Sequence, residues 1–181
     1  MSEKDRDILL IENQMCPVCS KNKATFSEYE IEDAFAGTIA IFSIKCTACG
    51  FKNSDLEFIN PGSPAEYSID IESRDDLDIR VIKAGVCEVI IPNFRISVDS
   101  SMASEGFISN IEGVIVRFKK QIEFLKEDSD LDKTQRKKLK NILKGIEEVL
   151  AGEKKITLKL KDETGNSAIV SDKVKIKKLK V

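Results

Sequence analysis

The sequence predicts a mainly β fold with one helical hairpin, an α+β arrangement in which a small four-cysteine ribbon precedes a larger domain. Three observations lead to this prediction. Two CxxC motifs lie in the first third of the chain, segments of alternating apolar and polar residues follow, and between these segments the apolar residues recur at steps of three and four. Alternation is typical of strands, whereas steps of three and four are typical of amphipathic helices.

The CxxC motifs supply the candidate metal ligands Cys16, Cys19, Cys46 and Cys49. Each motif places two thiolates on one tight turn, and two such turns form a tetrahedral all-sulfur cage. The chain contains no histidine, so a mixed Cys/His site is excluded. We expect one structural Zn²⁺ in a zinc ribbon. A rubredoxin-like iron site uses the same four thiolates and stays open, whereas a redox dithiol lacks the βαβ pattern that normally accompanies it.

Composition limits the class of protein. The chain has 181 residues, of which 41% are hydrophobic and 33% charged, enough for one domain with a real core beside a metal module. The N-terminus lacks a signal-peptide pattern and no apolar run approaches the roughly 18 residues of a membrane span, so we expect a cytoplasmic protein. The net charge of −2 argues against a general polyanion binder. The basic segments Arg136–Lys140 and Lys173–Lys180 are interpreted as solvated faces.

The first elements are those of the ribbon. Strands are expected over Ala24–Ile31 and Gly37–Lys45, joined by Glu32–Ala36, so that each end of this hairpin carries one CxxC turn. The loop Asn60–Pro64 is rich in Gly and Pro and marks a boundary. The predicted division is an N-terminal tail over residues 1–13, the zinc ribbon over 14–59 and the larger domain over 60–181.

The larger domain begins with short strands. Alternation at Tyr67–Ile71 and Ile79–Val81, followed by the apolar stretches Val86–Ile91 and Phe94–Val98, predicts a sandwich or barrel-like sheet. The fifth cysteine, Cys87, is interpreted as a small buried residue of one of these strands.

A helical hairpin follows at about residues 105–151. Its first helix is expected from about Glu105 to Lys126 and its second helix around Leu139–Leu150, with Ser129 or Asp130 as the cap and Gly152 at the end. The last strands are predicted at Ile156–Leu160, Ala168–Val170 and Val174–Leu179. We expect them to pair with the strands that precede the helices.

This order of parts resembles the Zpr-type zinc-finger proteins over most of the chain. The resemblance is carried by the sequence Cys49-Gly50-Phe51-Lys52-Asn53, by Glu112-Gly113 at the start of a long helix, and by Gly165-Asn166-Ser167 in a late hairpin. The family implies a zinc ribbon joined to an A-domain with a double-stranded β-helix-like sheet and a helical hairpin. Its eukaryotic members bind translation elongation factor 1-alpha and act as a dedicated chaperone in its folding.

Two departures from the family pattern affect this expectation. Eukaryotic members carry two ribbon-plus-A-domain modules, whereas this sequence holds one, as the archaeal-type members do, and whether a homo-oligomer replaces the second module stays open. The Gly-rich and Thr-Thr stretch that usually precedes the Glu-Gly pair is replaced here by Ser100–Asn110.

We therefore expect a zinc-dependent, non-catalytic partner of elongation factor 1-alpha. The candidate exposed contact residues are Phe51, Lys52, Asn53, Gly165, Asn166 and Ser167. The alternative is a nucleic-acid-binding zinc-ribbon protein acting in transcription or translation, which the acidic balance disfavours. An enzyme is not expected, because four thiolates close the coordination sphere of a metal.

Overall fold

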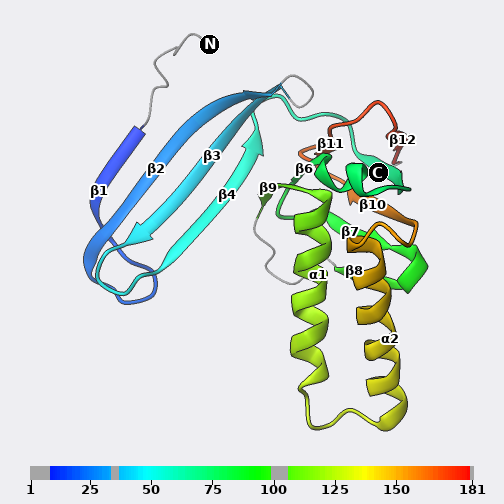
Figure 1. The fold of residues 1–181 in the computed structure, drawn as a ribbon. Helices are drawn as coiled ribbons and strands as arrows, with labels where there is room; N and C mark the ends of the chain where they lie inside the picture. Colours follow the sequence, from blue (N-terminus) through cyan, green and yellow to red (C-terminus); the bar gives the residue numbers. More distant parts are fainter. Residues whose placement is uncertain (1–8, 34–36, 99–105, 180–181) are drawn as a thin grey trace.

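The computed structural model describes residues 9–33, 37–98 and 106–179, and it contains a ribbon sheet, a β-rich body and a helical hairpin (Figure 1). The ribbon sheet is antiparallel, with the strand order β1-β2-β3-β4. Its strands are β1 (Leu9–Met15), β2 (Asn22–Asp33), β3 (Gly37–Cys46) and β4 (Lys52–Phe58). The hairpin β2–β3 pairs continuously from Ala24 opposite Cys46 to Asp33 opposite Gly37, as the sequence predicts.

Two of these strands differ from the sequence prediction. The predicted tail over residues 1–13 contributes β1 from Leu9 onward, and β4 follows the second CxxC turn where no strand was expected. Every residue of β1 is exposed, so this strand lacks the alternation of buried apolar and exposed polar residues by which a strand is recognised in a sequence. Its pairing with β2 is interrupted between Ile11 and Gln14, where Asn13 adopts a positive φ of 57°. Residues 1–8 and 34–36 lie outside the described part.

The body, residues 65–179, contains a five-stranded and a three-stranded antiparallel sheet. The first has the order β12-β5-β10-β7-β8 and the second the order β11-β6-β9. Their strands are β5 (Ala65–Ile71), β6 (Arg80–Lys83), β7 (Glu88–Ile91), β8 (Ile96–Val98), β9 (Phe107–Asn110), β10 (Ile156–Asp162), β11 (Ala168–Ile169) and β12 (Lys175–Lys178). The short 3-10 helices η1 (Arg74–Asp78) and η2 (Pro92–Phe94) follow β5 and β7. The late strands pair with early ones, which confirms the expected closure of the sheet.

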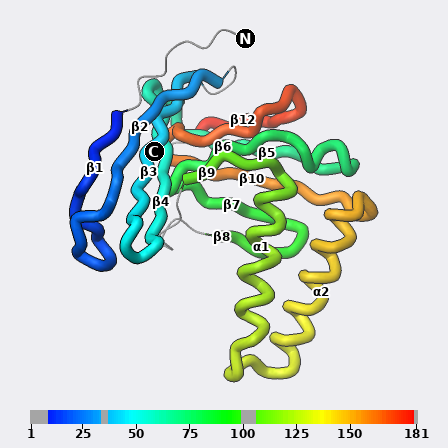
Figure 2. Tube along the Cα trace, turned by 60° about the vertical axis from the view of Figure 1, so that its left-hand side comes forward, coloured from blue at the N-terminus to red at the C-terminus, as the bar shows by residue number. Residues whose placement is uncertain are grey.

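The helical hairpin consists of α1 (Ile111–Lys126) and α2 (Lys133–Leu150), and it projects from the body in both views (Figures 1 and 2). The first helix begins later than predicted. Phe107 fits the helical spacing but lies in β9, and Asn110 caps α1 by accepting a hydrogen bond from the Gly113 amide. The cap of α2 is Asp132, which forms a capping box with Gln135, and neither Ser129 nor Asp130 has this role. Gly152, with φ of 77°, follows the end of α2 as expected.

One continuous core joins the hairpin to the body. Ile111, Val114, Ile115 and Phe118 of α1 and Ile146 and Val149 of α2 pack with Ile69, Ile71, Leu158 and Leu160 of the five-stranded sheet. Cys87 is fully buried in this core, as expected, but it lies one residue before β7 and not within a strand. Neither described helix is long and apolar enough to cross a bilayer.

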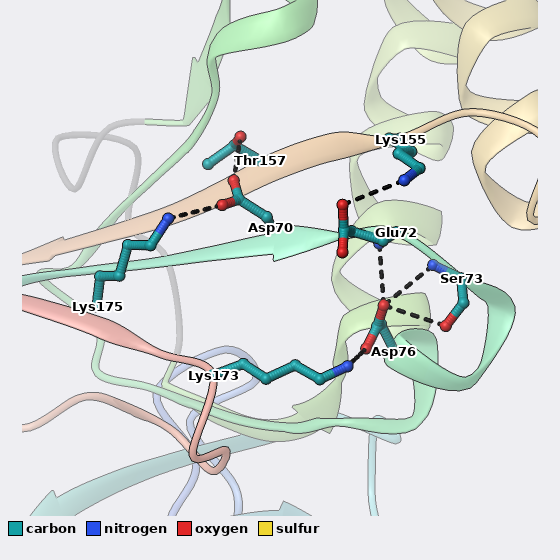
Figure 3. Close-up of polar contacts among 8 residues, drawn as sticks. All are labelled: Asp70, Glu72, Ser73, Asp76, Lys155, Thr157, Lys173 and Lys175. Atoms are coloured by element: carbon teal, nitrogen blue, oxygen red, sulfur yellow. Dashed lines mark hydrogen bonds and ion pairs between the residues drawn. The ribbon is translucent and has the colours of Figure 1, made fainter.

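A polar network fixes the end of the chain against η1 (Figure 3). The Asp76 side chain is only 3% exposed. Its Oδ2 accepts hydrogen bonds from the Glu72 and Ser73 amides at 2.9 and 3.0 Å, and its Oδ1 accepts one from Lys173 Nζ at 2.6 Å. The hydrogen bond from Lys173, supported by those from the two amides, lowers the pKa of Asp76 to about 2. Two residues further on, Lys175 pairs with Asp70 at 2.9 Å. The network therefore tethers β12 to the start of the body.

Candidate metal centre and its surroundings

The two CxxC turns have the same local geometry. In the first, the Ser20 amide donates to the Cys16 carbonyl at 2.9 Å, and in the second the Gly50 amide donates to the Cys46 carbonyl at 3.1 Å. The residue after each motif adopts a left-handed conformation, with φ of 57° at Ser20 and 75° at Gly50. This conformation reverses the chain, so both thiols of each motif point to the same side.

The four thiols meet at one point. All four Sγ atoms lie within 4.8 Å of one another. Two pairs, Cys16 with Cys49 and Cys19 with Cys46, are separated by 3.7 Å. A tetrahedral zinc ion with Zn–S bonds of about 2.3 Å requires sulfur atoms about 3.8 Å apart. The geometry therefore fits one structural Zn²⁺ with Cys16, Cys19, Cys46 and Cys49 as its ligands.

The pKa values of two of the four thiols are shifted in opposite directions. The Cys19 amide, by hydrogen bonding to the Cys16 sulfur, lowers the pKa of Cys16 to about 7. At Cys49 the Phe51 amide also favours the thiolate, yet burial and the three neighbouring sulfurs outweigh it and raise the pKa to about 12. Four thiolates cannot coexist without a positive charge between them, and a divalent metal ion supplies it.

The apolar core beside the cysteines is too small to hold this part of the ribbon together. Its buried members are Cys16, Ala24 and Cys46, with Phe51 and Ile44 packed against them. So few buried side chains cannot offset the entropy of ordering two turns. Metal coordination is consequently part of the folding free energy of the ribbon.

The predicted contact residues beside the second CxxC turn divide into two kinds. Phe51 packs on the cysteine cluster and is partly buried. Lys52 and Asn53 begin β4 and are exposed. Only the latter two are fully available to a partner.

The Gly165-Asn166-Ser167 turn faces inward, so its expected exposure is wrong. Gly165 has φ of 75°, and its carbonyl accepts a hydrogen bond from the Gly62 amide. The Asn166 side chain accepts one from the Phe58 amide of the ribbon sheet at 3.1 Å. Ser167 is fully buried and its hydroxyl accepts one from the Ala84 amide. The turn joins the ribbon sheet to the body, a role that the sequence did not indicate because its partners are far away along the chain.

The ribbon sheet has one covered face and one open face. On the covered face, Ile39, Leu56 and Phe58 form a small core with Ile82 of the body. Strand alternation places the next residues along each strand on the opposite face. That face carries Leu9, Ile11, Phe26, Phe42 and Ile44, which line a shallow cavity of about 370 Å³ together with Asn53. We call these five apolar residues the open face.

The open face was missed in the sequence analysis. Phe26 is 41% exposed and Phe42 is 38% exposed, large fractions for aromatic side chains on a regular sheet. The signal was present in the run Ile39-Ala40-Ile41-Phe42, because consecutive apolar residues in a strand are apolar on both faces. An apolar patch that the rest of the described chain leaves uncovered is typical of an interaction surface.

These features define a class of protein, a four-cysteine zinc ribbon fused to a β-sandwich body with a projecting helical hairpin. Comparisons with known proteins agree. The family model described as the ZPR1 jelly-roll domain matches residues 75–181. The chain belongs to the ZPR1 family.

Individual relatives cover most of the chain. A ZPR1-like protein of Pyrococcus horikoshii is 32% identical over 170 residues, which is 91% of this chain and 75% of that protein. A ZPR1-like protein of Methanocaldococcus jannaschii is 30% identical over 161 residues, 88% of this chain and 80% of that protein. The zinc finger chaperone zpr1 of Schizosaccharomyces pombe is 25% identical over 161 residues, and the match covers 34% of its length. The chain thus matches about a third of the yeast protein.

Proposed function

We propose that this chain is a cytoplasmic, zinc-dependent binding protein that assists the folding of the elongation factor 1-alpha GTPase without catalysing a reaction. The observation that carries the proposal is the open face, an apolar surface on a sheet whose covered face is fixed to the body. A folding helper must present apolar surface without burying it in its own core, and a stiff two-faced sheet meets this need. The yeast relative is named a zinc finger chaperone, which supports the same function.

Two further features support a binding role without chemistry. Four cysteine ligands complete the coordination of zinc and leave no position for water or substrate. Asn53, one of the residues expected to contact the partner, borders the open face. We propose that Lys52 and Asn53 form the rim of the partner contact, whereas Phe51 supports it from below.

The proposal is tested by measuring the affinity of the purified zinc-loaded chain for elongation factor 1-alpha from the same organism by calorimetry. The variant Phe26→Thr/Phe42→Thr keeps side chains that suit strands while removing the aromatic surface. We expect its affinity to fall by about ten-fold or more, as for apolar residues at the centre of an interface. The control Val86→Thr/Ile176→Thr changes two exposed apolar residues of the body and should bind normally.

The outcomes separate the alternatives. Failure of the zinc-loaded wild type to bind the elongation factor removes the proposed partner. Full affinity in a Phe26→Thr/Phe42→Thr variant that retains zinc removes the open face as the contact surface. Tight, strongly salt-dependent binding to RNA or DNA in place of the elongation factor establishes the nucleic-acid alternative.

A further inference from the structure

A second cavity, of about 430 Å³, lies between β4 of the ribbon sheet and the first turns of α1. Its apolar part is formed by Val89, Val98, Phe107 and Phe118. Its charged part consists of Lys83, Arg117 and Lys120, and none of its described lining residues is a carboxylate. We call this cavity the basic pocket. The described lining of this cavity is therefore positively charged, although the net charge of the whole chain is −2.

The two exposed cations have no anionic partner within the described residues. Arg117 and Lys120 lie one turn apart on the same side of α1. The Arg117 guanidinium stacks 4.2 Å from the centre of the Phe107 ring, and no described hydrogen bond or ion pair uses its donors. Stacking fixes the guanidinium plane and leaves its edge available for a carboxylate.

Several neighbouring cations of the body form ion pairs, whereas none is described for Arg117 or Lys120. Lys119, between them on α1, forms an ion pair with Glu147 of α2. Lys173 pairs with Asp76 and Lys175 with Asp70 (Figure 3). The carboxylate beside the basic pocket is that of Asp55, whose Oδ1 already accepts hydrogen bonds from the Gly106 and Leu56 amides at 3.1 and 2.9 Å.

Lys83 adds positive charge from beneath the pocket. Its side chain is 2% exposed, and its Nζ donates to the Ala84 carbonyl at 2.9 Å and to the Gly85 carbonyl at 3.2 Å. The carboxylates of Asp55 and Asp162 lie close enough to favour this ammonium and offset part of its charge, so Arg117 and Lys120 supply most of the positive charge available to a ligand. Burial lowers the pKa of Lys83.

We infer that the basic pocket binds an acidic segment of a protein partner, with a carboxylate on Arg117 and Lys120 and an adjacent apolar side chain on Val89, Val98 and Phe118. Charge complementarity selects the carboxylate, and the apolar wall selects a peptide over a free anion. Ser54 lines both the basic pocket and the cavity of the open face, so the two cavities meet at the edge strand β4. This inference rests on the proposed function only in that the acidic segment belongs to the protein that covers the open face.

The test uses a short fluorescein-labelled peptide with a central Asp-Glu pair flanked by leucines, and its Asn-Gln counterpart, in fluorescence anisotropy titrations. The zinc-loaded wild type is expected to bind the acidic peptide at least about ten-fold more tightly than the amide peptide. Arg117→Glu/Lys120→Glu should abolish this preference and bind a Lys-Lys peptide instead. The control Lys138→Glu/Lys140→Glu makes the same charge change at two exposed positions of α2 and should behave as the wild type.

Each other outcome overturns the inference. If the two peptides bind equally, the pocket does not distinguish acidic from neutral ligands. The same conclusion follows if a folded Arg117→Glu/Lys120→Glu variant keeps the wild-type preference. Displacement of the acidic peptide by millimolar inorganic phosphate or by RNA identifies a phosphate ligand instead. No elongation factor is present in these titrations, so they remain decisive if the proposed partner fails. The Phe26→Thr/Phe42→Thr variant should still bind the acidic peptide.

Discussion

Replacing Asp76 by Asn should destabilise the body by about 1–2 kcal/mol at pH 7. The network around Asp76 lowers its pKa from the usual 3.8 to about 2. Without solvent screening, a pKa change of that size corresponds to a stabilisation of the charged carboxylate by roughly 2.5 kcal/mol. Lys173, which donates the shortest of these hydrogen bonds, is 66% exposed. Solvent therefore screens part of the interaction, which gives the smaller figure.

The pH dependence follows from the direction of the pKa change. Because the folded-state pKa of Asp76 is depressed, its contribution is present above the ordinary value of 3.8 and is lost as the pH falls towards 2. The difference between the wild type and Asp76→Asn should therefore be constant from pH 7 to about pH 5 and should shrink below about pH 4.

The assay is urea unfolding followed by circular dichroism at 222 nm in zinc-containing buffer. Both described helices belong to the hairpin of the body, so this signal reports on the body rather than on the ribbon. Asp75→Asn is the matched control, because Asp75 lies in the same 3-10 helix, carries the same charge and is exposed. Lys173→Met completes a double-mutant cycle with Asp76→Asn.

Two results would refute this reasoning. The first is an effect of Asp76→Asn no larger than that of Asp75→Asn. The second is an equal cost of Lys173→Met in the wild type and in Asp76→Asn, since that would mean that the two side chains do not interact in solution.

Three further predictions concern the cysteines and the turn glycines. Cys46→Ser/Cys49→Ser should lower the zinc content, measured by plasma mass spectrometry, from about one ion per chain to nearly none, and hydrogen exchange should rise in β2 and β3 but not in α1. Burial raises the pKa of Cys87 to about 11, so at pH 8 this thiol should react with a disulfide reagent only after unfolding. Gly165→Ala should cost about 3 kcal/mol in urea unfolding, because its Cβ would meet a backbone carbonyl and its φ is 75°. Gly37→Ala, with φ of 73° and no atom of the described residues within 4 Å of the added Cβ, should cost about 1 kcal/mol.

The sequence was sufficient where the determining contacts are local. The CxxC turns are closed by hydrogen bonds within a few residues, so their pattern predicts the metal centre directly. Phe107 shows where apolar periodicity fails as a guide. Its spacing from the later apolar residues fits a helix, but α1 begins only after the cap Asn110, so Phe107 lies in the preceding strand β9. The exposed β1 offers no burial pattern to read.

Features that depend on distant contacts were beyond the sequence. Ser167 looks like a residue of an exposed turn until the fold brings it to the Ala84 amide, 83 positions earlier in the chain. The basic pocket combines Lys83 from β6 with Arg117 from α1 and Ser54 from the ribbon sheet. No sequence window contains all three, so neither the pocket nor its charge could be predicted.

The pairing of β5 with β10 and β12 sets an order of events during synthesis. β5 precedes the helical hairpin in the sequence, but both of its neighbours in the sheet follow the hairpin. The ribbon cysteines, by contrast, lie within 33 positions of one another and emerge from the ribosome first. Closing long loops is slow, whereas local hairpins form early. Zinc can therefore be captured by the nascent ribbon while β5 still awaits both of its partners, and the body is completed only when the last strand has been made.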